Sequence, residues 1–114
     1  MSKLQPGSRT VTVIGSFVVD LMGRADHLPV PGETVLGSSF KMGPGGKGSN
    51  QAVACHRAGG ETVFLTKLGK DLFSSIAIDF YKSEGMNTDF LLSHPTEPTG
   101  SALILVDEKT SQNK

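Results

Sequence analysis

The sequence has little cysteine and no long hydrophobic run, and each shortage excludes a class of protein. It contains one cysteine, Cys55, in 114 residues. A single cysteine excludes an internal disulfide framework and is typical of a reducing compartment, so we expect a cytoplasmic protein. No apolar run approaches the ~20 residues that a membrane span needs. Residues 1–10 are polar and lack the apolar core of a signal peptide.

An excess of charge of one sign is also missing. Eleven basic and eleven acidic side chains balance to a formal net charge of zero. They are spread along the chain and form no basic stripe. We therefore expect neither a nucleic-acid partner nor a membrane partner. The length suits one small domain, because domains cluster near ~100–150 residues.

Glycine, by contrast, is abundant and concentrated in one place. The chain has 14 glycines, well above the usual ~7% of residues. Those in the segment Gly43–Asn50, which reads Gly-Pro-Gly-Gly-Lys-Gly-Ser-Asn, stand closest together. Because each glycine costs backbone entropy on folding, such a cluster indicates a special backbone shape. We interpret the segment as a ligand-gripping turn at the head of a helix.

The apolar patterns around this turn predict an α/β fold. Strands are expected over residues 11–14, 62–68 and 101–106, and shorter extended pieces over 17–22, 33–42 and 89–92. Helices are expected over residues 49–58 and 72–84, with Ser49 and Asn50 as N-terminal caps and Gly59 and Gly85 as stops. Strands that alternate with helices favour a parallel central sheet. The extended pieces near Phe17 and Val35 are surplus to that sheet and could form a separate small β layer.

The end of the chain carries a strong apolar strand, residues 101–106, with only a short polar stretch behind it. Nothing follows that could return and pair with this strand, and complete proteins usually cover such an edge. We therefore expect the chain to be the N-terminal part of a longer protein. Residues 1–10 would be a polar tail, and residues 11–114 the folded portion.

The glycine turn suits an anionic or oxygen-rich ligand. Free backbone N–H groups and the positive end of the dipole meet at a helix start. Lys47 opposes this dipole, so we expect its side chain to point at an acid or a ligand, and Asn50 can both donate and accept. A Walker A loop is excluded, because it would need a glycine at Lys41 and a serine or threonine at Gly48.

A dinucleotide-binding domain stays open as an alternative. Its fingerprint is formally met by Gly43, Gly45 and Gly48. The context is poor, however, because the next predicted strand ends in Lys67 and Leu68 and not in the expected acidic residue.

The motif also resembles a known family. Residues 46–52 read Gly-Lys-Gly-Ser-Asn-Gln-Ala, and this run is similar to the N-terminal signature of PfkB-type sugar kinases, in the form found in ribokinases. The other matching positions, in order along the chain, are Gly15-Ser16 with Asp20, Pro31-Gly32-Glu33-Thr34, Gly59, Gly69 and Thr99-Gly100. The resemblance covers residues 11–113.

The resemblance implies a fold and an activity. The fold would be a ribokinase-like doubly wound α/β sheet with a small β lid, residues 101–106 would belong to the lid, and two subunits would form a homodimer through their lid strands. The reaction would transfer the γ-phosphoryl group of ATP to the primary (5-) hydroxyl of D-ribose, with Mg²⁺ and a monovalent cation such as K⁺.

The resemblance also assigns residues. Asp20 would accept hydrogen bonds from ribose hydroxyls, Gly46 and Lys47 would line the sugar pocket, and Asn50 would bind another hydroxyl. A carboxylate among apolar neighbours needs partners, and a polyol supplies them. The full implied substrate-binding set is Val18, Val19, Asp20, Gly46, Lys47, Gly48, Ser49 and Asn50.

The sequence departs from the family in two residues and in what it does not contain. Val18 stands where ribokinases often have a sugar-contacting asparagine, and Ser74 stands where glycine is commoner, a change expected to affect helix entry. In this family the catalytic aspartate and the nucleotide pocket lie in the C-terminal half. We therefore expect no catalytic, cofactor or metal residue in this chain, ATP, Mg²⁺ and K⁺ bound mainly through the missing half, and an inactive fragment. The alternative is a non-catalytic truncated isoform that acts as a dimerising lid module.

Overall fold

The structure, a computed structural model, describes residues 9–110. The polar tail predicted for residues 1–10 lies almost entirely outside them. The chain divides into two compact units. Of the described residues, the α/β unit comprises 9–19 and 44–100. The other unit comprises 20–43 and 101–110, and we call it the lid unit after the part that the family resemblance predicts these residues to form. No helix in residues 9–110 is long and apolar enough to cross a membrane.

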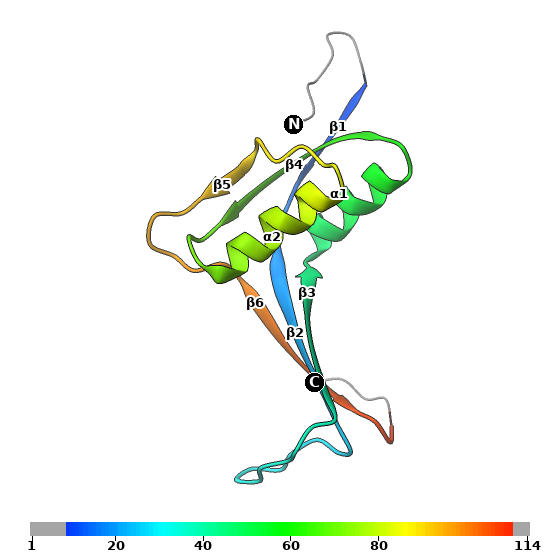
Figure 1. Cartoon of the computed structure of the whole chain (residues 1–114), viewed down its shortest axis with the longest axis vertical. Helices are drawn as coiled ribbons and strands as arrows, with labels where there is room; N and C mark the ends of the chain where they lie inside the picture. Colours follow the sequence, from blue (N-terminus) through cyan, green and yellow to red (C-terminus); the bar gives the residue numbers. More distant parts are fainter. Residues whose placement is uncertain (1–8, 111–114) are drawn as a thin grey trace. The chain divides into compact units, whose positions relative to one another are not determined.

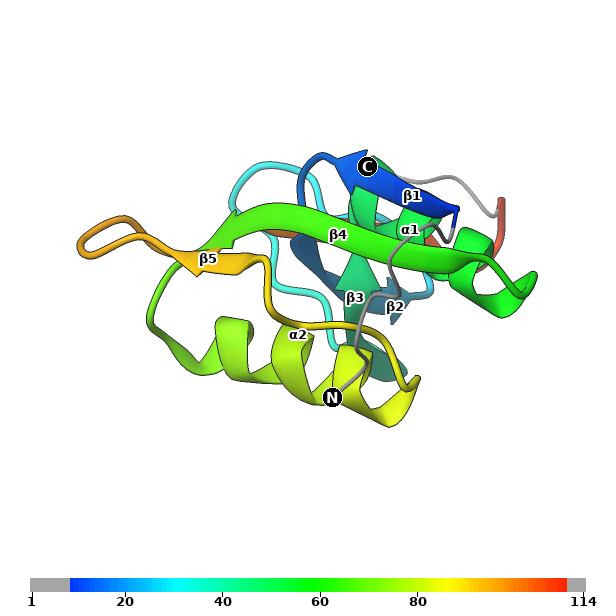
Figure 2. The same cartoon turned by 90° about the horizontal axis from the view of Figure 1, so that it is seen from above.

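The α/β unit is a parallel sheet with two helices on one face (Figures 1 and 2). Its strands are ordered β1-β4-β5, and β1 aligns Val13 with Phe64 of β4. Because right-handed crossovers step from β1 to β4 to β5 in one direction, both helices belong on the same face. The elements are β1 (Thr10–Ile14), α1 (Lys47–Arg57), β4 (Glu61–Leu68), α2 (Leu72–Ser83) and β5 (Leu91–Ser93).

Aromatic side chains form the centre of this unit's core. Tyr81 of α2 is 1% exposed. Its ring packs edge-on against Phe64 and Phe17, with distances between ring centroids of 5.7 Å and 6.2 Å. Ala77, one turn earlier on α2, is fully buried. The helical spacing predicted over 72–84 therefore turns its apolar face onto the sheet.

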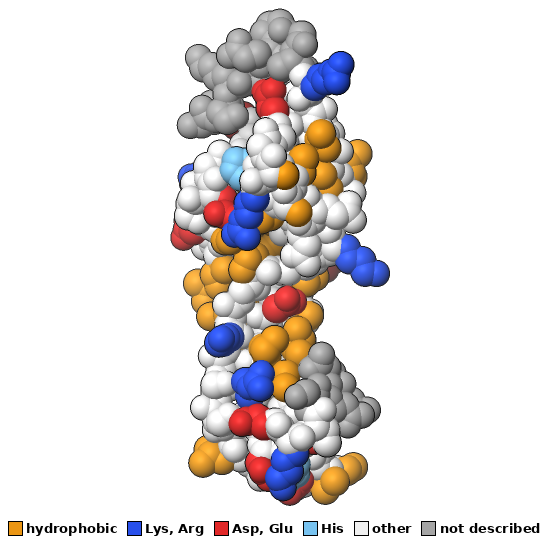
Figure 3. All heavy atoms as spheres, turned by 90° about the vertical axis from the view of Figure 1, so that its right-hand side faces the viewer, with side chains coloured by type: hydrophobic (Ala, Val, Ile, Leu, Met, Phe, Trp, Pro, Cys, Tyr) orange, Lys and Arg blue, Asp and Glu red, His pale blue; other side chains and the backbone are white. Residues whose placement is uncertain are grey.

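The lid unit is built on a second sheet, with strand order β3-β2-β6. Its strands are β2 (Val18–Ala25), β3 (Ser39–Gly45) and β6 (Ser101–Asp107). A second small sheet is therefore present, as predicted, and residues 101–106 belong to it, but Val35 lies outside its strands. Figure 3 shows hydrophobic side chains on one side of the molecule. Four large apolar side chains of this sheet are exposed. They are Phe40, Met42, Leu103 and Leu105.

Two strand predictions need correction. The strand expected over 33–42 begins only at Ser39. Its expected start, Glu33, lies instead in a turn of residues 30–33, in which the Glu33 N–H donates to the Val30 carbonyl at 3.0 Å. The strand over 101–106 was expected to lack a partner, yet β6 pairs with β2. An unpaired strand is therefore no reason to expect a longer chain.

The caps predicted for the first helix are also wrong. The helix α1 begins at Lys47, its N-cap is Gly46, and no side chain caps it. Ser49 is the third residue of the helix and so lies inside it, where its hydroxyl makes a tertiary hydrogen bond with Tyr81. The predicted stops are confirmed, with positive φ at Gly59 (94°) and Gly85 (76°).

Candidate functional site

Gly46 makes the bend between strand β3 and helix α1. Its φ of 98° is a conformation that side-chain-bearing residues rarely adopt. A Cβ placed there would lie 2.6 Å from the carbonyl oxygen of Ser16 and 3.1 Å from the nitrogen of Val18. Glycine is therefore required twice, for the backbone angle and for close packing against residues 16–18.

The next glycine of the motif also packs against backbone. A Cβ on Gly48 would lie 2.7 Å from the Cα of Gly15. The start of α1 thus meets the end of β1 at a contact between two glycines. The Ser49 N–H donates to the Ser16 carbonyl at 3.2 Å across the same contact. Part of the glycine enrichment therefore serves packing between segments and not the approach of a ligand.

The head of α1 keeps donors for a ligand. The Asn50 N–H donates to the Gly46 carbonyl at 2.9 Å, whereas the amides of Lys47 and Gly48 have no acceptor among residues 9–110. The side chains of Lys47 and Asn50 are exposed on this first turn. Unpaired N–H groups at a helix start, beside a cation and an amide, suit a ligand rich in oxygen atoms.

Ser49 faces inward from the same turn. Its hydroxyl lies 2.5 Å from the hydroxyl of Tyr81, and both residues are 1% exposed. Burial raises the pKa of the Tyr81 phenol, an effect that the Ser49 hydrogen bond opposes. Sequence reasoning missed Tyr81. The signal was present, because a phenol on the apolar face of a helix needs a buried partner.

The structure distributes the remaining predicted residues over both units. Val18 is half-buried, and Val19 is fully buried with its N–H donating to the Gly100 carbonyl at 2.9 Å. Val18, Gly46, Gly48 and Ser49 come together where α1 begins. Asp20, the next residue along β2, belongs to the lid unit and is half-buried there.

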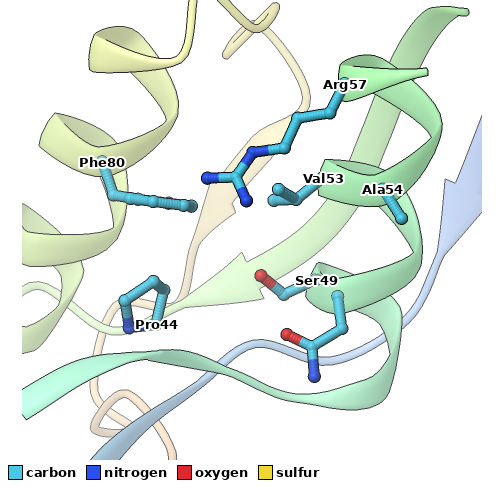
Figure 4. A pocket seen from close by; sticks show the side chains of 7 residues that line it. Pro44, Ser49, Val53, Ala54, Arg57 and Phe80 are labelled. Carbon is cyan, nitrogen blue, oxygen red and sulfur yellow. The ribbon is translucent and has the colours of Figure 1, made fainter.

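A pocket of about 470 Å³ lies between α1 and α2 (Figure 4). In Figure 4 the guanidinium of Arg57 extends from α1 toward the ring of Phe80 on α2. Arg57 is paired with Glu84 through its Nε at 2.5 Å, so its charge is balanced. Two of the predicted sugar-binding residues, Ser49 and Asn50, line this pocket. The other lining residues are Pro44, Val53, Ala54, Arg57 and Phe80.

Comparison with known proteins decides the family. The pfkB family carbohydrate kinases match residues 8–114. The chain belongs to this family. It is 40% identical to the ribokinase of Bacillus subtilis (strain 168) over 100 residues, which are 88% of this chain and 34% of that protein. It is 39% identical to the deoxyribokinase of Salmonella typhi over 103 residues, or 90% of this chain and 34% of the relative.

A solved structure supports the same assignment. The ribokinase of Arabidopsis thaliana complexed with ribose and ATP has a TM-score of 0.80 at 29% identity, over 92% of this chain and 34% of that one. The predicted resemblance to the PfkB-type ribokinases and the ribokinase-like α/β fold are thus confirmed. The chain spans about a third of the length of the relatives it matches.

The topology also bears on the dinucleotide alternative. The dinucleotide fingerprint joins a strand to a helix within one parallel βαβ unit. Here the strand before the turn is β3, which pairs with β2 and not with β4. The glycines Gly43, Gly45 and Gly48 therefore lack the setting that this fingerprint requires.

Proposed function

We propose that this chain is the sugar-binding and lid-bearing N-terminal part of an ATP-dependent kinase that phosphorylates the 5-hydroxyl of D-ribose. The observation that carries the proposal is the pfkB-type glycine turn at the start of α1, with the amides of Lys47 and Gly48 free to donate. Membership of a carbohydrate-kinase family supplies the reaction class. The similarity to the ribokinase of Bacillus subtilis and to the Arabidopsis ribokinase complexed with ribose and ATP supports ribose as the substrate.

The proposed roles follow the chemistry of each group. The carboxylate of Asp20 accepts hydrogen bonds from ribose hydroxyls. Such hydrogen bonds are stronger when the acceptor is charged than when it is neutral. Lys47 and Asn50 donate from the exposed first turn of α1, and Gly46 leaves its backbone uncovered beside them. This set binds and orients a neutral polyol.

Buried members of the predicted set act differently in this proposal. Ser49 fixes α1 through Tyr81, and Gly48 lets α1 approach Gly15. Val18 and Val19 give shape and backbone position beside Asp20. A contact between ribose and Val18 would be apolar or made through backbone, where ribokinases often have asparagine. This makes 2-deoxyribose the informative competitor substrate.

The cofactors are assigned outside these residues. Among residues 9–110, no group of three or more His, Cys, Asp or Glu side chains is placed to hold a metal ion. No step of phosphoryl transfer is assigned to these residues. We propose that ATP, Mg²⁺ and K⁺ bind in a further segment, and that this chain alone is inactive. Val11 and Ile14 on the edge strand β1 are 47% and 76% exposed, and further strands would cover them.

The lid sheet is the proposed contact of a cytoplasmic homodimer. Phe40, Met42, Leu103 and Leu105 are each at least 43% exposed, and a Cβ on Gly23 would lie 3.7 Å from Leu105. Large apolar groups gathered on a small sheet are typical of an interface. Sedimentation of the wild type and a Leu103→Lys variant tests this, since the variant should sediment as a monomer. A wild type that is monomeric at every concentration would exclude it.

The kinase activity is tested with the complete reading frame that encodes this chain. We expect ADP formation that depends on ribose, and Asp20→Asn should lower kcat/KM about 10- to 100-fold, the value of a hydrogen bond to a charged group. Asp79→Asn, an exposed carboxylate on α2, is the matched control and should leave it unchanged. Turnover of NAD, or the absence of turnover with every sugar tested, would contradict the proposal.

The non-catalytic alternative is separated by a mixing experiment. A chain that acts only as a lid module would co-elute with a full-length kinase subunit in size-exclusion chromatography and add no activity of its own. Separate elution, with activity residing in the complete reading frame, supports the kinase.

A further inference from the structure

Asp71 makes more hydrogen bonds than helix capping requires. Its Oδ1 accepts from the Ser74 N–H at 2.9 Å, which caps α2. The Ser74 hydroxyl accepts from the Asp71 N–H at 3.1 Å and completes a capping box. Yet Asp71 also accepts from the Thr99 hydroxyl at 2.7 Å and from the Thr99 N–H at 2.8 Å. The two hydrogen bonds from Thr99 contribute nothing to the cap. They are the main cause of the lowered pKa of the Asp71 carboxyl.

Thr99 is held from a second side. It is 5% exposed, and its hydroxyl accepts from the Gly69 N–H at 2.9 Å. A Cβ on Gly69 would lie 2.6 Å from both the Glu97 oxygen and the Thr99 nitrogen. Residues 97–99 therefore lie directly on the backbone at the end of β4, and Asp71 and Gly69 clamp Thr99 between them. We name this arrangement of Gly69, Asp71 and Thr99 the clasp.

The clasp continues toward the predicted sugar-binding carboxylate. Gly100, which follows Thr99, accepts the Val19 N–H at 2.9 Å. Val19 is fully buried and directly precedes Asp20. The chain leaves the α/β unit at these two points, between Val19 and Asp20 and between Gly100 and Ser101. One clasp thus anchors both departures.

We propose that Asp71 is a positioning residue for the sugar site: through Thr99 and Gly100 it fixes Val19, and so the place from which Asp20 is presented. The inference rests on the proposed function, because Asp20 matters only if it binds sugar. A role in capping alone would need one carboxylate oxygen and no contact with Thr99. Misplacing a binding group by a small distance is costly, since orientation contributes strongly to productive binding.

Amide hydrogen exchange on this chain tests the clasp without any activity. Asp71→Ser keeps a good N-cap but is too short to reach Thr99, and Thr99→Val removes only the hydroxyl. We expect the Val19 amide to exchange at least about tenfold faster in both variants, while the Ala77 amide inside α2 is unchanged. Thr99→Ser should restore protection, and Asp79→Asn is the control. Unchanged exchange at Val19 in both variants would overturn the proposal.

Kinetics of the complete reading frame test the consequence. Asp71→Ser and Thr99→Val should raise KM for ribose about fivefold or more, with kcat and KM for ATP within about twofold, as expected for loss of substrate positioning. Ribose turnover with an unchanged KM in these variants would overturn the positioning role and leave the proposed function standing. A wild type without ribose turnover would instead defeat the proposed function, while exchange at Val19 would still report on the clasp. Should Asp71→Ser unfold α2, seen as lost Ala77 protection, the Thr99→Val and Thr99→Ser pair decides.

Discussion

Removing the Tyr81 hydroxyl should destabilise the α/β unit by a specific, measurable amount. In Tyr81→Phe the ring and its contacts with Phe64 and Phe17 remain, so no cavity forms around the aromatic core. What is lost is the bond to the Ser49 hydroxyl at 2.5 Å. Because Ser49 is 1% exposed, water cannot replace the lost partner. Leaving a buried polar group unsatisfied costs about 1–3 kcal/mol.

The double variant separates this explanation from a general loss of packing. Ser49→Ala should cost a similar amount, because it leaves the Tyr81 hydroxyl alone in the core. Ser49→Ala with Tyr81→Phe removes both polar groups together, so it should be no less stable than either single variant. The coupling free energy between the two sites should therefore be at least about 1 kcal/mol, within the range measured for residues in contact.

The assay is urea and thermal unfolding followed by circular dichroism. For a domain of this size, 1 kcal/mol lowers Tm by about 4–8 °C. Ser75→Ala, which removes an exposed hydroxyl from α2, is the control and should stay within about 0.5 kcal/mol of wild type. Single variants that each cost under about 0.5 kcal/mol, or that add independently, would refute the buried Ser49–Tyr81 bond.

Two further predictions concern other parts of the structure. Gly46→Ala should destabilise the protein more than Gly59→Ala. Both positions have positive φ, and the backbone strain of an alanine there costs about 1–3 kcal/mol at each. Of the two, only Gly46 would also bring the new Cβ against another atom, the Ser16 carbonyl oxygen at 2.6 Å. Equal unfolding free energies would contradict this. The hydrogen bond to Glu33 at 2.9 Å raises the pKa of His27 above its ordinary 6.5. The stability that His27 contributes is therefore complete below pH 6.5 and is lost as the pH rises through the raised pKa. An NMR titration should show a midpoint above 6.5 that falls in Glu33→Gln, and a wild-type midpoint at or below 6.5 would be the opposite result.

The sequence predicts those elements whose signals are local. Helix α2 was expected over 72–84 and runs over Leu72–Ser83, because its apolar period and the stop at Gly85 act within a few residues. The Ser74 departure affects helix entry as expected, since its hydroxyl completes the capping box with Asp71. The parallel strands β1 and β4 followed equally from their β-branched runs.

Nonlocal contacts explain the misses. Serine is a common N-cap residue, but the helix begins two residues before Ser49. The Ser49 hydroxyl instead forms a hydrogen bond with the distant Tyr81, so a tertiary contact overrides the local preference. Nothing in residues 101–106 indicates that their partner is β2, because strand pairing is set by segments far apart in sequence. For the candidate site, the motif residues could be found from spacing. The support for Asp20 through Thr99 and Asp71 could not, because it depends on hydrogen bonds across 28 positions of the chain.

The assignment of this chain to a ribose kinase is tested by ribose-dependent ADP formation by the complete reading frame, compared between wild type, Asp20→Asn and Asp79→Asn. We expect turnover with ribose for the wild type and for Asp79→Asn, and kcat/KM lowered about 10- to 100-fold for Asp20→Asn. A wild type that forms no ADP with any sugar, or an Asp20→Asn variant with the wild-type kcat/KM, would contradict it.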